Sequence, residues 1–181
     1  MAEFAVNDRS YRLPSGPMAV VCVDGCEDAY LNVALEQGRM PQLAGILAGG
    51  WRGMARGALP SFTNVNNAAI VTGQPPVVTG LSGNFFLDPD TGEEVMMNSA
   101  DFLYLSLTDY IQHKFAPEEE GALEFYAALD EQLGRLADLG CRLGITADHG
   151  MNAKCHADGS PRVIYVAVSY THLTLPTIYS V

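Results

Sequence analysis

The sequence predicts an α/β fold in which helices flank a mainly parallel sheet. Two short apolar runs are typical of buried strands: Met18 to Val23, which is rich in β-branched residues, and Cys141 to Ala147. An amphipathic helical pattern precedes the second run, and acidic residues follow both of them. With 181 residues, one domain with a substantial core is the natural expectation.

Two helical patterns and a second candidate strand follow the first apolar run. Apolar residues recur at helical spacing from Tyr30 to Leu35 and, after Gly38, from Met40 to Leu47. Met54 to Leu59 is predicted to be a strand that Pro60 ends.

Thr63 lies where the next helix is expected to start, because residues 68–72 have helical character. Two interpretations are open. The hydroxyl is either an N-cap that accepts a hydrogen bond from the helix backbone, or a nucleophile at the positive end of the helix, where a phosphoryl group binds well. Both can hold together.

The middle of the chain is expected to hold a loop, a hairpin and a strand. Residues 73–83 are rich in Gly and Pro, which is typical of a loop. Short apolar runs at 84–87 and 94–97 flank Asp-Pro-Asp-Thr-Gly, which indicates a β-hairpin. Phe102 to Leu107 is predicted to be a strand.

The clearest helix begins near Pro117, where Glu118 to Glu120 place negative charge at the positive end of the helix dipole. Gly140 ends it. Its apolar stripe consists of Leu123, Tyr126, Leu129, Leu133 and Leu136. The stripe predicts packing on a sheet, and residues 102–147 as a whole predict a right-handed crossover between parallel strands.

Three of the predicted strands lead into an acidic residue: Asp24, Asp109 and Asp148. His149 follows Asp148, and His113 lies one helical turn after Asp109. Ligands bind at the carboxyl ends of parallel strands, and carboxylates gathered there repel one another unless cations lie among them. Because Asp and His are suitable zinc ligands, the pattern predicts a two-metal hydrolase. For Asp148 and His149 alone, an ordinary polar turn is the alternative.

Composition argues against several partners. The formal net charge of −11 argues against nucleic acid, because phosphate contacts need clustered Lys and Arg. No apolar stretch approaches a membrane span, and residues 1–9 lack the pattern of a secretory signal. We therefore expect a cytoplasmic protein without nucleic-acid or membrane partners, in which the four cysteines are reduced.

Six segments, in order, resemble phosphonoacetate hydrolase, a di-zinc family of the alkaline phosphatase superfamily. The two most specific are Thr-Asp-Tyr-Ile-Gln-His-Lys at 108–114 and Thr-Ala-Asp-His-Gly-Met-Asn-Ala-Lys at 146–154. The others are Val-Asp-Gly-Cys at 23–26, Pro-Ser-Phe-Thr-Asn at 60–64, Gly-Asn-Phe-Phe at 83–86 and Glu-Glu-Val-Met-Met-Asn at 93–98. The resemblance extends to about Val166 and implies an alkaline-phosphatase-like core.

The resemblance implies two zinc ions. One would be held by Asp24, Asp148 and His149, and the other by Asp109 and His113.

The implied reaction is hydrolysis of the C–P bond of phosphonoacetate, a small anionic phosphonate, to acetate and phosphate. Thr63 would be the nucleophile and would also contact the first zinc ion, and Asn84 would hydrogen-bond a phosphonate oxygen.

The chain departs from the family pattern in three places. A long family segment whose lysines recognise the substrate is expected to be missing near 99–104, so that the core lacks its cap, and no Lys or Arg cluster replaces those lysines. The chain stops before the family's last zinc-binding histidine, so the second zinc site is expected to be incomplete. Residues 169–181 look like a translated sequencing adapter. The expected organisation is an incomplete catalytic core at 1–168 and a non-native tail.

Three functions stay open. A zinc-dependent phosphonoacetate hydrolase, with impaired activity in this chain, is favoured. Another phosphodiesterase or phosphatase of the superfamily would use similar ligands, whereas a non-catalytic remnant would bind zinc without turnover. A homodimer is compatible with the sequence.

Overall fold

The computed structural model describes residues 3–6, 9–88, 90–96 and 108–162. Its strands are β1 (Glu3–Val6), β2 (Arg9–Arg12), β3 (Met18–Cys22), β4 (Phe85–Leu87), β5 (Glu94–Met96) and β6 (Arg142–Thr146). Its helices are α1 (Asp28–Glu36), α2 (Pro41–Gly49), α3 (Thr63–Thr72), α4 (Pro76–Thr79), α5 (Asp109–Lys114) and α6 (Glu120–Asp138).

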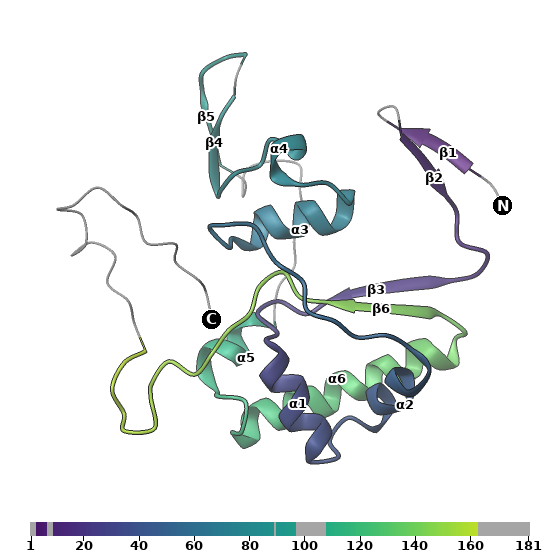
Figure 1. Ribbon diagram of the computed structural model, residues 1–181, viewed down its shortest axis with the longest axis vertical. Helices are drawn as coiled ribbons and strands as arrows, with labels where there is room; N and C mark the ends of the chain where they lie inside the picture. Colours follow the sequence, from purple (N-terminus) through teal and green to yellow (C-terminus); the bar gives the residue numbers. More distant parts are fainter. Residues whose placement is uncertain (1–2, 7–8, 89, 97–107, 163–181) are drawn as a thin grey trace.

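The central sheet is a parallel pair formed by β3 and β6, with Met18 opposite Arg142 and Cys22 opposite Thr146. The hairpins β1–β2 and β4–β5 are antiparallel and lie away from this pair (Figure 1). Because β3 and β6 run in the same direction, their carboxyl ends meet at one edge of the sheet. The predicted α/β fold with a parallel sheet flanked by helices is confirmed.

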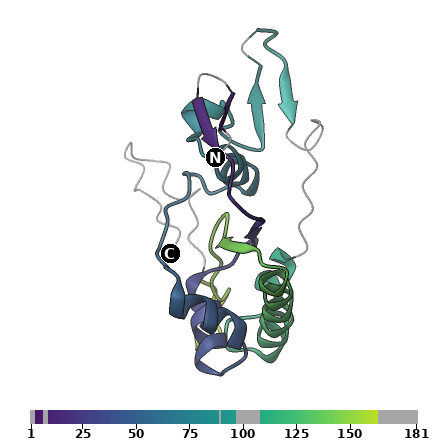
Figure 2. The same ribbon diagram turned by 90° about the vertical axis from the view of Figure 1, so that its right-hand side faces the viewer.

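Helices α1, α2 and α6 pack on one face of the parallel pair (Figures 1 and 2). The core between them consists of Tyr30, Ala34, Met40, Leu43, Ala122, Leu123, Tyr126 and Leu133. Asp130 is the buried polar residue of this interface, and its carboxylate accepts hydrogen bonds from the backbone N–H groups of Gln42 and Leu43 at 2.9 and 2.7 Å. A negative charge on α6 thereby stabilises the positive end of α2.

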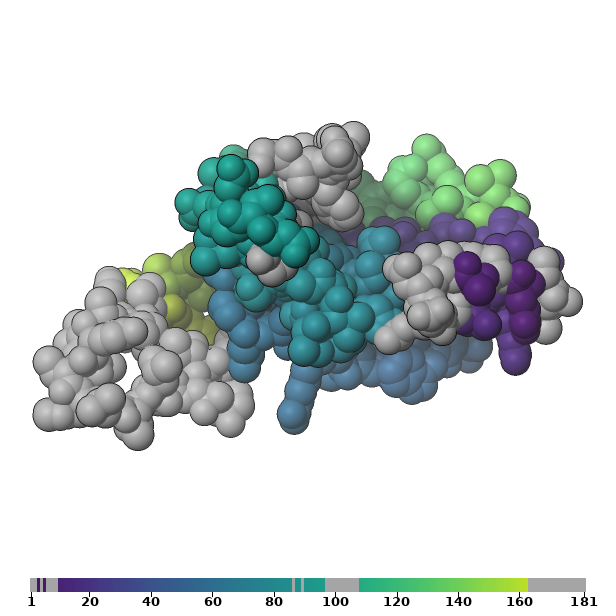
Figure 3. Space-filling model, turned by 90° about the horizontal axis from the view of Figure 1, so that it is seen from above, coloured from purple at the N-terminus to yellow at the C-terminus, as the bar shows by residue number. Residues whose placement is uncertain are grey.

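Helix α3 lies on the other side of the central pair from α6 (Figure 1). Seen from above, α3, α4 and the β4–β5 hairpin lie between the N-terminal strands and the segment that follows β6 (Figure 3). Among the described residues, no helix is long and apolar enough to cross a membrane.

The predicted strand from Met54 to Leu59 is wrong, since residues 51–58 form no helix or strand. The side chain of Asn66 on α3 explains why. Its Oδ1 accepts a hydrogen bond from the Ala58 N–H at 2.8 Å, so this backbone group is bonded to a helix side chain instead of a neighbouring strand. A Cβ atom at Gly57 would lie 3.0 Å from Nδ2 of Asn66, which shows how closely the segment follows α3.

Two other predictions differ from the structure in extent. The expected loop at 73–83 contains the single turn of α4, which begins at Pro76, a favourable first helical residue. The predicted strand at 102–107 lies outside the described residues, and so does that part of the expected crossover. Within the described residues the predicted hairpin is confirmed by the pairing of β4 with β5, and the amphipathic helix that ends before Gly140 is confirmed as α6.

Candidate active site

Two acidic residues follow the parallel strands where the chain turns. Asp24 and Asp148 are each only 3% exposed. The N–H of Val23 donates to the carbonyl oxygen of Thr146 at 2.8 Å, so the strands stay together up to the residues that precede the two carboxylates. The Gly25 N–H then donates to Oδ1 of Asp148 at 3.2 Å. Parallel pairing therefore brings together two acidic residues that are far apart in the sequence.

Gly25 makes room for a third carboxylate. Its φ is +70°, in the left-handed region that favours glycine. A Cβ atom at this position would lie 2.9 Å from Oδ1 of Asp109 and 3.7 Å from Cε1 of His149. Both the turn and the close approach of these side chains thus require a residue without a side chain.

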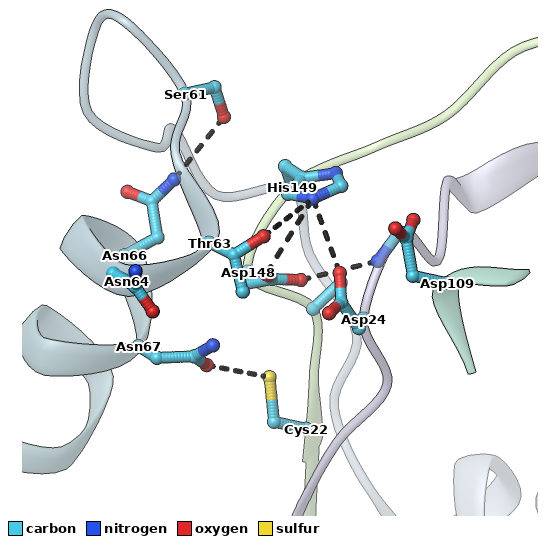
Figure 4. Close-up of polar contacts among 12 residues, drawn as sticks. Cys22, Asp24, Ser61, Thr63, Asn64, Asn66, Asn67, Asp109, Asp148 and His149 are labelled. Atoms are coloured by element: carbon cyan, nitrogen blue, oxygen red, sulfur yellow. Dashed lines mark hydrogen bonds and ion pairs between the residues drawn. The ribbon is translucent and has the colours of Figure 1, made fainter. Parts of the chain in front are cut away.

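His149 is at the centre of the cluster (Figure 4). Its Nε2 atom lies 3.2 Å from Oδ1 of Asp24, 3.7 Å from Oδ2 of Asp148 and 3.2 Å from Oγ1 of Thr63. The hydrogen bond to Asp24 raises the pKa of His149 to about 9, although burial acts in the opposite direction. Burial also raises the pKa of Asp148. The carboxylates around His149 thus favour the protonated form of its imidazole.

Thr63 is the first residue of α3, and its hydroxyl points toward His149 (Figure 4). The N-cap residue is Phe62, and no side chain caps the helix. The interpretation of Thr63 as an N-cap is therefore wrong. Its hydroxyl lies beside the acidic cluster, at the positive end of a helix of 10 residues.

The second predicted pair lies on α5. Nε2 of His113 is 3.0 Å from Oδ2 of Asp109, so the expected shared helical face is confirmed. Ligand atoms of Asp24, Asp109 and His149 all lie within 4.8 Å of one another. The two predicted zinc sites are thus adjacent, and Asp109 lies between His113 and the strand-end cluster.

The donor set fits a divalent cation. Oδ1 of Asp109 and Oδ2 of Asp148 are buried and accept no hydrogen bond from the described residues. A buried carboxylate oxygen without a donor costs free energy unless a cation neutralises it. Carboxylate oxygen and imidazole nitrogen together suit zinc.

Asn84 lies just before β4, close to the first turn of α3. Its Oδ1 accepts a hydrogen bond from Nδ2 of Asn64 at 3.3 Å, and Asn64 follows Thr63 directly. No hydrogen bond among the described residues joins Asn84 to Thr63 or to the acids. Asn84 is exposed, so its amide is accessible to a ligand.

Two buried amides that hold the site in place were not predicted. Oδ1 of Asn67 on α3 accepts a hydrogen bond from Sγ of Cys22 at 3.3 Å, which ties the helix of Thr63 to the strand of Asp24. Nε2 of Gln112 donates to the Tyr126 hydroxyl at 2.8 Å and holds α5 on α6. The sequence did offer one indication of their role, because Asn67 shares a helix with Thr63 and Gln112 directly precedes His113.

Comparison with known proteins gives a family and a fold. Residues 18–103 and 101–167 match the family model described as type I phosphodiesterase / nucleotide pyrophosphatase. The structure is similar to two crystal structures of phosphonoacetate hydrolase from Sinorhizobium meliloti 1021, one in complex with phosphonoformate and one with phosphonoacetate. The sequence identities are 32% and 31%, and the TM-score is 0.72 for both. Each match covers 91% of this chain and 63% of the hydrolase chain, so this chain spans less than two thirds of that length.

Proposed function

Because the chain belongs to the type I phosphodiesterase / nucleotide pyrophosphatase family, in the alkaline phosphatase superfamily, we propose that its strand-end cluster is the active site of a zinc-dependent phosphonoacetate hydrolase. The observation that carries this proposal is the contact between the Thr63 hydroxyl and Nε2 of His149 at 3.2 Å. It brings a candidate nucleophile beside buried acids that suit a metal. If Asp148 and His149 formed only a polar turn, neither the nearby Thr63 hydroxyl nor the burial of the carboxylates would be needed.

In this proposal Asp24, Asp148 and His149 would hold one zinc ion, and Asp109 and His113 would hold the second. Bound zinc lowers the pKa of a hydroxyl nucleophile and stabilises negative charge that develops at phosphorus. Oδ1 of Asp109 and Oδ2 of Asp148, which are buried and accept no hydrogen bond from the described residues, support these assignments.

Thr63 has the central chemical role. Its Oγ1 gives up its proton to solvent water and forms a bond to phosphorus while the C–P bond breaks, and the electron pair of the C–P bond leaves with the CH2 group of the substrate. That carbanion delocalises into its own carboxylate and takes up a proton to give acetate. Water then hydrolyses the phosphoryl-threonine and releases phosphate, which restores the Thr63 hydroxyl.

The surrounding chain preorganises that hydroxyl. Thr63 begins α3, whose backbone N–H groups favour an anionic phosphoryl group at this end. Asn84 would donate a hydrogen bond to a phosphonate oxygen, which its position beside the first turn of α3 supports. The two solved relatives are complexes with phosphonoacetate and phosphonoformate, which supports a small anionic phosphonate as the substrate class.

We propose in addition that this chain is an impaired form of the enzyme. The two matched segments meet at 101–103, where a family segment is expected to be missing. Among the described residues the second metal keeps only Asp109 and His113, fewer than the three protein ligands typical of a catalytic zinc. We also expect no nucleic-acid partner, because the net charge is −11.

Hydrolysis of a phosphodiester is the alternative function, and the description of the matching family favours it. The test uses an extended chain, which adds to this sequence the segments that the Sinorhizobium meliloti hydrolase has and this chain lacks. This extended chain is supplied with zinc and with either phosphonoacetate or a nitrophenyl phosphodiester. We expect phosphate release from phosphonoacetate to be faster than nitrophenol release from the diester. A preference for the diester would favour the alternative, and bound zinc without turnover of either would indicate a non-catalytic remnant.

A further inference from the structure

A pocket of about 320 Å³ opens between the end of α5 and the segment that follows β6. Figure 1 shows this segment passing α5 on its way from β6. His113, Lys114 and Lys154 line the pocket, together with Glu119 from the start of α6. Because Nε2 of His113 also contacts Asp109 at 3.0 Å, the pocket adjoins the candidate metal centre.

Lys114 and Lys154 are the only lysines in the sequence. They are 40 positions apart in the sequence, which gave no indication of a basic cluster in place of the family's recognition lysines. The structure corrects this expectation, since both lysines line one pocket.

The two lysines lack carboxylate partners among the described residues. Nζ of Lys114 lies over the ring of Phe115, 5.0 Å from its centroid, and Nζ of Lys154 donates to Sδ of Met151 at 3.0 Å. By contrast, Arg39 and Arg135 each form an ion pair with a glutamate at 2.8 and 2.7 Å. The chain has 21 acidic and 10 basic residues, so its overall electrostatic field repels anions. At this one pocket, two lysines without carboxylate partners among the described residues make the potential more positive than over the rest of the chain.

Glu119 is the acidic residue that lines the pocket. Its Oε2 accepts a hydrogen bond from the Ala116 N–H at 2.5 Å. The carboxylate is therefore engaged by the backbone where α6 begins, and it only partly offsets the two ammonium groups.

We propose that this pocket binds a small oxyanion of the phosphate or phosphonate class, with Lys114 and Lys154 as its cationic ligands. A site for such an anion beside His113 would hold incoming substrate or departing phosphate next to the metal centre, and this role rests on the proposed function. Anion binding by the lysines itself requires no metal.

The presence of only two lysines makes a direct test feasible. Reductive methylation with ¹³C-formaldehyde labels both ammonium groups and keeps their charge. Lys114→Gln removes one signal and thereby assigns both. Inorganic phosphate and phosphonoacetate are then titrated separately into chelator-treated protein, and the labelled N-terminal amine serves as an internal control.

We expect both lysine signals to shift along one saturable curve while the N-terminal signal shifts much less. Lys114→Gln or Lys154→Gln should weaken binding about three- to fivefold, as read from the remaining signal. In unlabelled protein followed by phosphorus NMR, Lys154→Arg should retain the affinity, and Glu119→Gln, which keeps an acceptor for Ala116, should increase it. Shifts without saturation, or affinities that none of these variants changes, would overturn the proposal. Because zinc is absent, this result is independent of whether the cluster catalyses hydrolysis.

Discussion

The Thr63 hydroxyl lies 3.2 Å from Nε2 of His149, although the two residues are 86 positions apart in the sequence. Helix α3 supplies the hydroxyl and the turn after β6 supplies the imidazole. The buried Asn67 amide, bonded to Cys22 at the end of β3, holds the helix in position to make this contact. A nucleophile and a metal-ligand cluster are therefore joined by packing between distant segments.

Zinc binding should depend on the acids that follow the parallel strands. We expect Asp148→Asn to lower zinc affinity at least about tenfold, because Asn supplies no negative charge to the cation. The control is Asp158→Asn, which neutralises an exposed acid that accepts hydrogen bonds from Ser160 and, among the described residues, lies outside the cluster. Competition with a chromophoric chelator gives both affinities. Equal affinities for the two variants would show that the metal binds elsewhere.

Gly25 should be needed for the metal site as well as for the turn. In Gly25→Ala, the new Cβ would lie 2.9 Å from Oδ1 of Asp109, so this carboxylate must shift. Gly38→Ala is a matched control, because its φ of +68° is nearly the same and nothing lies within 4 Å of its Cβ.

Both variants should lose about 1 kcal/mol of unfolding free energy in urea, since Ala is strained at this φ. Only Gly25→Ala should also bind zinc more weakly. If both variants kept wild-type zinc affinity, Asp109 would not be a ligand.

The buried hydrogen bond from Gln112 to Tyr126 should stabilise the placement of α5. Tyr126→Phe leaves Nε2 of Gln112 without its partner at 2.8 Å, which should cost about 1–3 kcal/mol of unfolding free energy. Tyr110→Phe removes a hydroxyl from a side chain that is 65% exposed, and we expect a much smaller change. Urea unfolding of both variants measures the difference. Equal losses would mean that the buried bond contributes nothing specific.

Much of the fold and cluster could be predicted because the signals are local. Apolar runs that lead into Asp24 and Asp148 mark strand ends, and parallel pairing then forces the two acids together. The spacing of Asp109 and His113 likewise fixes one helical face. The strand-end acids could be placed from the direction of the strands, and the Asp109 and His113 pair from the periodicity of a helix.

Predictions that depended on distant partners were wrong or missing. The composition of Met54 to Leu59 suits a strand, but a side chain on α3, Asn66, bonds the backbone of this segment. The joint placement of Lys114 and Lys154 depends on how the chain after β6 passes α5, which no local pattern encodes.

The chain as it stands should hydrolyse phosphonoacetate at least about a hundredfold more slowly than the extended chain. The leaving group is a carbanion, so the transition state depends on preorganised positive charge, and loss of one such donor costs about a hundredfold. Phosphate release from the two chains at equal zinc loading measures the ratio. Comparable rates would show that the catalytic charge lies within this chain.

The most direct test of the account is the role of Thr63 in the extended chain. Thr63→Ala removes the proposed nucleophile but keeps Asp24, Asp148 and His149, whereas Thr63→Ser keeps a hydroxyl. The measurement is phosphate release from phosphonoacetate, with zinc content determined on the same samples. We predict that the alanine variant loses turnover at nearly unchanged zinc content and that the serine variant keeps measurable turnover. An alanine variant that turns over at close to the wild-type rate would contradict the assignment of this cluster as a threonine-dependent active site.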